Sequence, residues 1–104
     1  MSVLMEFSIF PTDRGESVSA YVSEVIAMIR ESGLEYRLTP MGTIVETERL
    51  DHALKLIEQA ENILTRQGCH RIYAAIKLDI RAGRDGGLKQ KITSIEERIG
   101  EVKT

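Results

Sequence analysis

The most regular alternation in the chain lies in residues 71–81, which read Arg71-Ile72-Tyr73-Ala74-Ala75-Ile76-Lys77-Leu78-Asp79-Ile80-Arg81. Every even-numbered side chain in this stretch is apolar, whereas the odd-numbered side chains include four charged groups. Successive side chains of a β-strand point to opposite faces of its sheet. The stretch therefore predicts a long strand with one apolar face and one mixed face.

Residues 3–10 alternate in the same way and predict a first strand. Their odd-numbered side chains are all apolar, whereas Glu6 and Ser8 fall on the other side. The first strand thus repeats the two-faced pattern of residues 71–81.

Residues 34–39 and 43–47 predict a hairpin of two shorter strands. Pro40, Met41 and Gly42 lie between them, a combination that favours a tight reversal of the chain. If the second of these strands keeps the phase of the first strand, Ile44 and Glu46 lie on the mixed face.

Two segments with helical periodicity separate these strands. The first is expected at residues 18–32, where Ser17 or Ser19 can cap its start. The second is expected to begin after a Thr47 cap and to end at Gly68.

A last helix is expected at about residues 88–103. Its apolar residues recur at spacings of four, three, four and three, which is a short heptad-like stripe. The stripe consists of Leu88, Ile92, Ile95, Ile99 and Val102. We expect this stripe to contact its own domain or, preferably, another subunit, because the polar face mixes Lys and Glu.

The order β-α-β-β-α-β followed by a helix predicts an α+β fold, the ferredoxin-like antiparallel sandwich with an extra C-terminal helix. Its core spans about residues 3–82 of a single domain, residues 1–104. We expect the two helices to cover the apolar sides of the first and fourth strands. The mixed sides of these strands then form an open face.

Composition excludes several classes of protein. With 104 residues the chain fits one domain. Its net charge of −2, without a run of like charges, argues against nucleic-acid and membrane-surface binding. The hairpin strand at residues 43–47 also lacks the aromatic side chains on which RNA bases stack. No apolar run is long enough to span a membrane.

Cysteine usage and the N-terminus predict a protein of the cytoplasm. The single cysteine, Cys69, cannot form an intramolecular disulfide, and residues 1–10 lack the features of a signal peptide. Cys69 and His70 have no partners at a metal-ligand spacing, so we expect no metal site, no cofactor and a buried thiol. The glycines in residues 83–87 match no phosphate-binding motif and predict a flexible turn.

Charged residues gather on the predicted open face. These are Glu6, Lys77, Asp79 and Arg81. Opposed residues of neighbouring strands lie about 5 Å apart, so Glu6, Asp79 and Arg81 can share one small site. A network of salt bridges at an oligomer interface is an equally valid interpretation.

Four segments together carry a resemblance to a known family. They are Ser17-Val18-Ser19-Ala20-Tyr21-Val22, Ser32-Gly33-Leu34-Glu35-Tyr36, Pro40-Met41-Gly42-Thr43-Ile44-Val45-Glu46 and Ile76-Lys77-Leu78-Asp79-Ile80-Arg81. In order and spacing they resemble the thiamine-binding proteins, the small YkoF-like family. The resemblance covers about residues 3–82. It implies a ferredoxin-like fold that associates through its sheets into dimers and tetramers, and that binds thiamine or its hydroxymethylpyrimidine moiety without a demonstrated reaction.

The resemblance also implies a set of ligand-binding residues. Glu46 suits an aminopyrimidine, because a carboxylate accepts from an exocyclic amine and its protonated form donates to a ring nitrogen. The remaining candidates are Met41, Gly42 and Thr43 for close backbone approach and polar contacts, Ser8, Ser17 and Ser19 at the mouth, and Phe10 or Tyr36 for stacking on the ring.

Two other functions remain open on the sequence. One is an oligomeric regulatory module that binds another small metabolite or an anion at subunit interfaces. The start of the helix after Ser17 and Ser19 is one candidate anion site, although ordinary capping explains these serines better. The other is a small hydrolase, for which only Asp79 with Arg81 offers a base and an orienting cation. Ligand selectivity and a turnover assay separate these readings from the thiamine-binding one.

Overall fold

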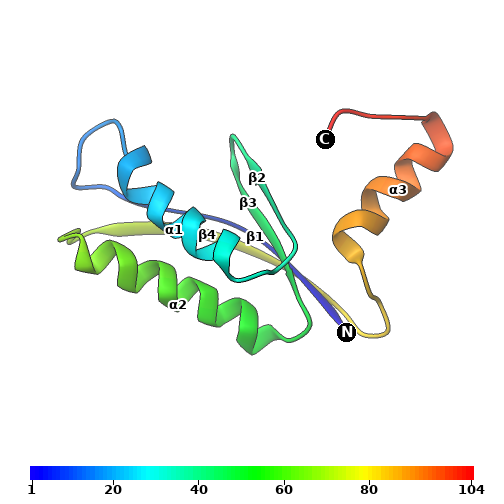
Figure 1. Cartoon of the computed structure of the whole chain (residues 1–104), viewed down its shortest axis with the longest axis horizontal. Helices are drawn as coiled ribbons and strands as arrows, with labels where there is room; N and C mark the ends of the chain where they lie inside the picture. Colours follow the sequence, from blue (N-terminus) through cyan, green and yellow to red (C-terminus); the bar gives the residue numbers. More distant parts are fainter.

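The computed structural model describes residues 1–104 and contains one four-stranded antiparallel sheet and three helices (Figure 1). The strands are β1 (Ser2–Pro11), β2 (Tyr36–Thr39), β3 (Gly42–Thr47) and β4 (Ile72–Arg81), and the helices are α1 (Ser19–Glu31), α2 (Leu50–Arg66) and α3 (Gly87–Ile99). The spatial strand order is β2-β3-β1-β4. The ferredoxin-like α+β fold with an added C-terminal helix is therefore confirmed.

β1 occupies the centre of the sheet and pairs with both β3 and β4. Its odd-numbered side chains are buried against α1 and α2, as the alternation predicts. The core comprises Val3, Met5, Phe7, Ile9, Val25, Ile29, Val45, Ala53, Leu56, Ala60, Leu64 and Cys69. Cys69 is buried and free, as expected.

The register also fixes which residues share the open face. Leu4 lies opposite Glu46, and Glu6 lies opposite Ile44, so β3 keeps the phase of β1. On the other side of β1, Glu6 lies opposite Lys77 and Leu4 lies opposite Asp79. The predicted mixed face is therefore present on three strands.

The expectation that the apolar side of β4 is covered by helices is wrong for most of its length. Ile76, Leu78 and Ile80 lie on the helix side of the sheet but remain 40%, 41% and 48% exposed. The reason is strand order, because β4 is an edge strand and α1 and α2 lie mainly over β1 and β3. An apolar row and one full strand edge are left open in the single chain.

Helix starts differ from the predicted caps. Val18 holds the N-cap of α1, and neither Ser17 nor Ser19 makes a capping hydrogen bond. Arg49 holds the N-cap of α2, whereas Thr47 stays in β3 and donates its hydroxyl to the Arg49 carbonyl at 2.9 Å. Serine and threonine side chains can bond to nearby backbone in several local geometries. Their presence therefore indicates a turn but does not identify the first residue of the helix.

The last helix is shorter than predicted, because α3 ends at Ile99 and Val102 lies beyond it. Gly100 follows with a φ of 87°, a left-handed conformation that stops the helix. The Val102 amide instead donates to the Glu96 carboxylate at 3.2 Å. None of the helices is long and apolar enough to cross a membrane.

The hairpin turn is held by one threonine. Thr39 donates its hydroxyl to the Gly42 carbonyl at 2.8 Å and accepts from the Met41 amide at 3.2 Å. A Cβ on Gly42 would lie 3.1 Å from the Phe7 carbonyl oxygen, so a larger residue would push the hairpin away from β1. Gly42 therefore allows β3 to approach β1 at this end.

We predict that Met5→Ala lowers the free energy of unfolding by about 2–5 kcal/mol, because Met5 is fully buried in the core. The matched control is Met41→Ala at the hairpin tip, where the side chain is 89% exposed and the expected change is within about 0.5 kcal/mol. Urea unfolding measures both variants. Equal effects at the two methionines would contradict the assigned core.

Candidate functional site

An apolar cleft lies between α1 and the β2–β3 hairpin, with a volume of about 400 Å³. Val18, Val22, Val25 and Ile26 contribute the α1 wall. The opposite wall comes from the end of β1 and the hairpin, and comprises Phe7, Ser8, Ile9, Phe10, Leu38, Thr39, Pro40, Met41, Gly42 and Thr43.

Five of the residues expected to bind ligand line this cleft, namely Ser8, Phe10, Met41, Gly42 and Thr43. The other four do not. Ser17 and Ser19 are exposed, Tyr36 packs partly buried against the core, and Glu46 lies farther along β3. The Phe10 and Tyr73 ring centroids lie 5.8 Å apart with the ring planes tilted by 39°, so the Phe10 ring packs against β4 on the open face.

The chemistry of the cleft is apolar with a few hydroxyl groups. Its lining contains no charged residue, and its polar side chains are Ser8, Thr39 and Thr43. Concave apolar sites with a few polar groups are typical of small-molecule binding. The cleft suits a flat ring that makes a small number of hydrogen bonds.

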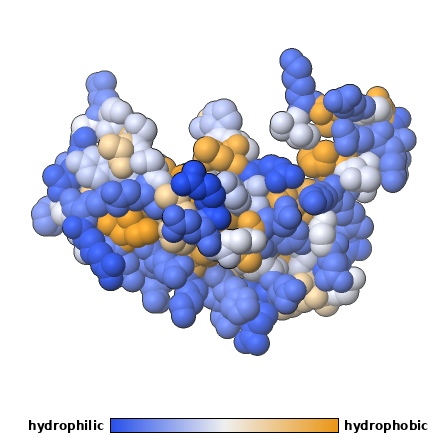
Figure 2. Space-filling view, viewed as in Figure 1, coloured by the Kyte–Doolittle hydropathy of each residue, from blue (hydrophilic) through white to orange (hydrophobic).

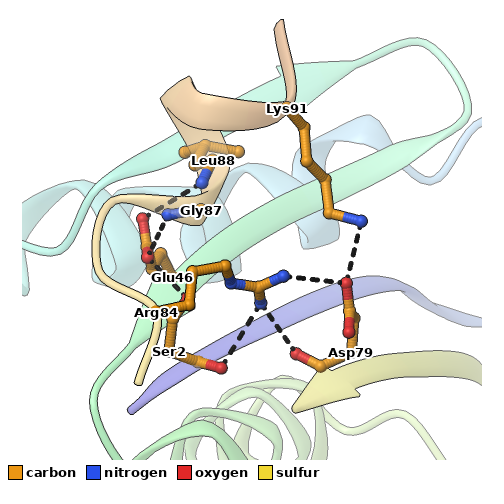
Figure 3. A network of polar contacts seen from close by, with 7 residues as sticks. All are labelled: Ser2, Glu46, Asp79, Arg84, Gly87, Leu88 and Lys91. Carbon is orange, nitrogen blue, oxygen red and sulfur yellow. Dashed lines mark hydrogen bonds and ion pairs between the residues drawn. The ribbon is translucent and has the colours of Figure 1, made fainter. Parts of the chain in front are cut away.

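Glu46 joins the sheet to the start of α3 (Figure 3). Its carboxylate accepts hydrogen bonds from the Ser2 hydroxyl at 2.7 Å, the Gly87 amide at 2.8 Å and the Leu88 amide at 3.3 Å. Both carboxylate oxygens are used. The first amides of a helix lack partners within the helix, so Glu46 caps α3 from another element.

Burial of Glu46 acts to raise the pKa of its carboxyl group, but the hydrogen bonds from Ser2, Gly87 and Leu88 and the nearby Arg84 charge outweigh it. The net pKa is lowered from 4.5. The carboxylate is therefore the form that holds α3. Its stabilising effect is complete above about pH 4.5 and is lost as the pH falls through the lowered pKa.

Arg84 anchors the turn between β4 and α3 (Figure 3). It is only 6% exposed, and it donates to the Asp79 carboxylate at 3.2 Å, the Asp79 carbonyl at 3.3 Å and the Ser2 carbonyl at 3.4 Å. Lys91 reaches the same Asp79 carboxylate at 2.8 Å. Hydrogen bonds from Lys91 and Arg84 lower the pKa of Asp79.

The sequence predicts a flexible turn at residues 83–87 and assigns no role to Arg84. The structure builds this turn around the buried guanidinium, and a Cβ on Gly87 would lie 2.7 Å from Arg84 Nε and 3.0 Å from Ser2 Oγ. The two glycines directly after Asp85 are the feature of the sequence that indicates this packing, because residues without a side chain allow the backbone to lie close to a neighbouring group.

The charged residues of the open face do not form one shared cluster. Glu6 pairs with Lys77 at 3.0 Å, whereas Asp79 pairs with Arg84 and Lys91. Glu6, Lys77 and Asp79 still line one shallow hollow on this face, but Arg81 lies outside it and forms no ion pair. The combination of Asp79 with Arg81 is therefore not assembled in the single chain.

Metal-ligating side chains are not gathered anywhere in the chain. No group of three or more His, Cys, Asp or Glu residues is arranged to hold a metal ion. Cys69 lies in the core beside the junction of α2 and β4. The cleft between α1 and the hairpin brings together five of the expected ligand residues and is therefore the candidate site.

Comparison with known proteins identifies the family. The model of a family described as "Thiamine-binding protein" matches residues 5–96. The chain belongs to the thiamine-binding protein family. A UPF0045 protein of Mycobacterium bovis is 32% identical over 99 residues, covering 95% of this chain and 96% of that protein. A UPF0045 protein of Methanothermobacter thermautotrophicus is 31% identical, covering 80% and 84%.

Solved structures of proteins of similar length share the fold. A Methanocaldococcus jannaschii protein superposes with a TM-score of 0.80 at 30% identity, covering 92% of this chain and 97% of the other. A Thermotoga maritima protein, whose name refers to thiamine biosynthesis or salvage, has a TM-score of 0.77 at 19% identity, with coverages of 91% and 99%. The second likeness is one of fold alone.

We predict that Glu46→Ala lowers the free energy of unfolding by about 1–3 kcal/mol at pH 7, because the amides of Gly87 and Leu88 and the Ser2 hydroxyl lose their acceptor. The difference from the native protein is expected to shrink below pH 4.5, as the native carboxylate becomes protonated. Urea unfolding at pH 7 and at pH 3 measures it.

The exposed neighbour Glu48 supplies the control, because Glu48→Ala removes a carboxylate that makes no hydrogen bond or ion pair. A Glu46→Ala effect no larger than that of Glu48→Ala, or one that does not change with pH, would show that Glu46 does not hold α3.

Proposed function

We propose that this chain binds thiamine, or its hydroxymethylpyrimidine moiety, in the cleft between α1 and the hairpin, without catalysing a reaction. The supporting observation is that the thiamine-binding family match spans both walls of a cleft lined by five of the expected ligand residues. These five come from β1, the hairpin turn and β3, so the cleft depends on the fold as a whole.

The chemistry of the cleft fits a pyrimidine ring. Its apolar walls bury the faces of a flat heterocycle, while Thr43, on the helix side of β3, supplies a hydroxyl group that donates or accepts at the ring edge. Gly42 also lines the cleft, and its lack of a side chain lets β3 approach β1 beside it. The cationic thiazolium of thiamine then extends toward the mouth, because the cleft itself holds no countercharge.

Binding without turnover is supported by the absence of a nucleophile and base pair among the cleft residues. The hydrolase alternative needs Asp79 to act with Arg81, but Asp79 is engaged by Arg84 and Lys91. An assay with simple phosphate and acyl esters separates the two, since only a hydrolase releases product.

A second location for the ligand is the polar hollow beside Glu46, with a volume of about 680 Å³. Glu35, Glu46, Glu48 and Asp85 line it, so it favours a cation such as thiamine. We prefer the apolar cleft because both oxygens of Glu46 already accept hydrogen bonds within the chain.

The proposal includes a cytoplasmic homo-oligomer, a tetramer of sheet-paired dimers. The edge of β4 supports it. The Thr12 amide donates to the Arg71 carbonyl, which shows that the N–H and C=O groups of odd-numbered β4 residues point toward β1. The N–H and C=O groups of Ile76 and Leu78 therefore point outward from the edge of the sheet. A second β4 can pair antiparallel with this edge and cover the exposed apolar row.

An oligomeric regulatory module that binds another metabolite or an anion remains the alternative. It shares the fold and the assembly, and it differs only in ligand. Selectivity decides between them, because a pyrimidine site prefers thiamine, hydroxymethylpyrimidine and thiamine phosphate over unrelated metabolites or inorganic phosphate.

We predict saturable calorimetric binding of thiamine or hydroxymethylpyrimidine, and at least a tenfold weaker affinity in Val22→Phe, whose larger side chain fills the cleft from α1. Ser23→Phe is the matched control, because Ser23 lies on the exposed side of the same helix and its variant should bind normally. Circular dichroism establishes that both variants fold.

Glu46→Gln distinguishes the two locations in the same titration. Unchanged affinity in Glu46→Gln together with lost affinity in Val22→Phe supports the cleft. The reverse pattern moves the ligand to the Glu46 hollow. No heat from a folded native oligomer with any pyrimidine compound would contradict the proposed function and favour the regulatory module.

We predict that Leu78→Lys halves the molar mass of the native assembly measured by light scattering, because it places a charge in the exposed row of β4. Met41→Lys is the control, since Met41 is exposed at the tip of the hairpin, which lies on the other side of β1 from β4. An unchanged mass in Leu78→Lys would exclude pairing through this edge.

A further inference from the structure

A separate groove lies on the open face of the sheet, between α3 and the β2–β3 hairpin. Its volume is about 530 Å³, which is within the range of small-molecule sites. Figure 2 shows apolar surface on α3 and near the hairpin, with a hollow between the two. We call it the open-face groove; the hairpin contributes Arg37 and Ile44 to its walls, and α3 contributes Lys89, Ile92 and Glu96.

The open-face groove has apolar surface on both walls. Ile44 points to the open face, because it lies opposite Glu6 of β1, and it is only half-buried. Ile92 comes from α3 and is 39% exposed. Covering apolar surface with an apolar group is favourable by about 25 cal/mol per Å². The groove therefore favours a ligand that is apolar in part.

Cations flank this apolar surface. Arg37 lies opposite Ile44 in the ladder between β2 and β3, so its side chain is on the open face. Lys89 lies on the α3 wall, and Lys103 follows α3 in the chain. None of these three cations belongs to an ion pair of the chain. Their charges are therefore available to a ligand.

One carboxylate side chain, that of Glu96, lies among these cations. It accepts a hydrogen bond from the Val102 amide at 3.2 Å and forms no ion pair. An excess of positively charged side chains remains in the groove, although the chain as a whole has a net charge of −2. This excess attracts an anion and disfavours a cation such as thiamine.

We propose that the open-face groove binds a phosphate monoester of an apolar ring or short chain. Such a phosphate group carries about −1.5 to −2 charges at pH 7, which suits two cations on opposite walls. The Arg37 guanidinium donates two parallel hydrogen bonds to phosphate oxygens, and the Lys89 ammonium donates from α3. The apolar part of the ligand covers Ile44 and Ile92.

The open-face groove and the proposed pyrimidine cleft are separate sites that share one wall. Leu38 and Thr39 line both, so β2 stands between them. The cleft lining contains no charged residue, whereas the groove lining contains four. The two sites therefore select ligands of different charge, and the groove ligand does not depend on the proposed function.

Calorimetric titration of the whole chain with 2-naphthyl phosphate tests the proposal. We expect saturable binding at one site per chain. Inorganic phosphate and 2-naphthol each carry one part of this probe, and both are expected to bind more than about tenfold more weakly. No binding of 2-naphthyl phosphate, or equally tight binding of either part alone, would overturn the proposal.

Charge reversal tests the location of the phosphate group. Arg37→Glu combined with Lys89→Glu is expected to weaken the binding of 2-naphthyl phosphate more than about tenfold, because charge-assisted hydrogen bonds are lost. The matched control is Arg30→Glu combined with Lys55→Glu, which changes the net charge equally at exposed positions of α1 and α2. Circular dichroism establishes that both variants fold. Equal weakening in the two would indicate a general charge effect and contradict the groove site.

Two further variants separate this proposal from the proposed function. Val22→Phe fills the pyrimidine cleft and is expected to bind 2-naphthyl phosphate normally. Ile92→Gln is expected to bind it about fivefold more weakly, because apolar contact in the groove is lost. The reverse pattern would place the naphthyl ring in the cleft and overturn the proposal. A failure of hydroxymethylpyrimidine to bind would contradict the proposed function alone.

A lipid headgroup offers the same phosphate monoester chemistry as a free compound. Sedimentation with phosphatidylcholine vesicles that contain phosphatidic acid distinguishes the two sources. We expect no protein to sediment with the vesicles, because the hairpin and α3 stand on either side of the groove and keep a membrane surface out of it. Sedimentation that is lost in Arg37→Glu with Lys89→Glu would overturn the assignment to a free ligand.

Discussion

The strict alternation of β1 is the constraint on which the rest of the structure depends. This strand pairs with a neighbour on each side, and its odd-numbered residues Val3, Met5 and Phe7 are buried beneath the helices. The even-numbered residues Leu4 and Glu6 point to the other face of the sheet. A slip of one residue would exchange the two faces. The positions of α1 and α2, the register of β3 and β4, and the composition of the open face all follow from it.

Three parts of the molecule are incomplete in a single chain. The cleft between α1 and the hairpin is open, the edge of β4 is unpaired, and α3 exposes most of its stripe. Glu46 connects the sheet to α3, because it belongs to β3 and caps α3. Placement of the C-terminal helix is thus set by the sheet, and the proposed ligand cleft and the proposed assembly edge lie on separate surfaces of the fold.

Sequence alone predicted the elements and the faces of this structure, since alternation and helical periodicity are local properties. It did not predict that Ile76, Leu78 and Ile80 are exposed, because alternation identifies the face of a strand and not whether that strand lies at an edge. Arg84 was missed for a related reason: one of its acceptors is the Ser2 carbonyl, at the other end of the chain. Five of the nine ligand candidates meet in one cleft, whereas Glu46 lies elsewhere, because residues of one motif need not converge in space.

The central claim is that the cleft beside α1 receives the pyrimidine ring, and a nuclear magnetic resonance titration of the labelled protein with hydroxymethylpyrimidine tests it most directly. The account predicts amide shift changes that saturate with ligand and gather at Ser8, Val22, Gly42 and Thr43, with little change at Glu48 and Gly87. Changes confined to Glu48 and Gly87, or no change at any concentration of ligand, would contradict it.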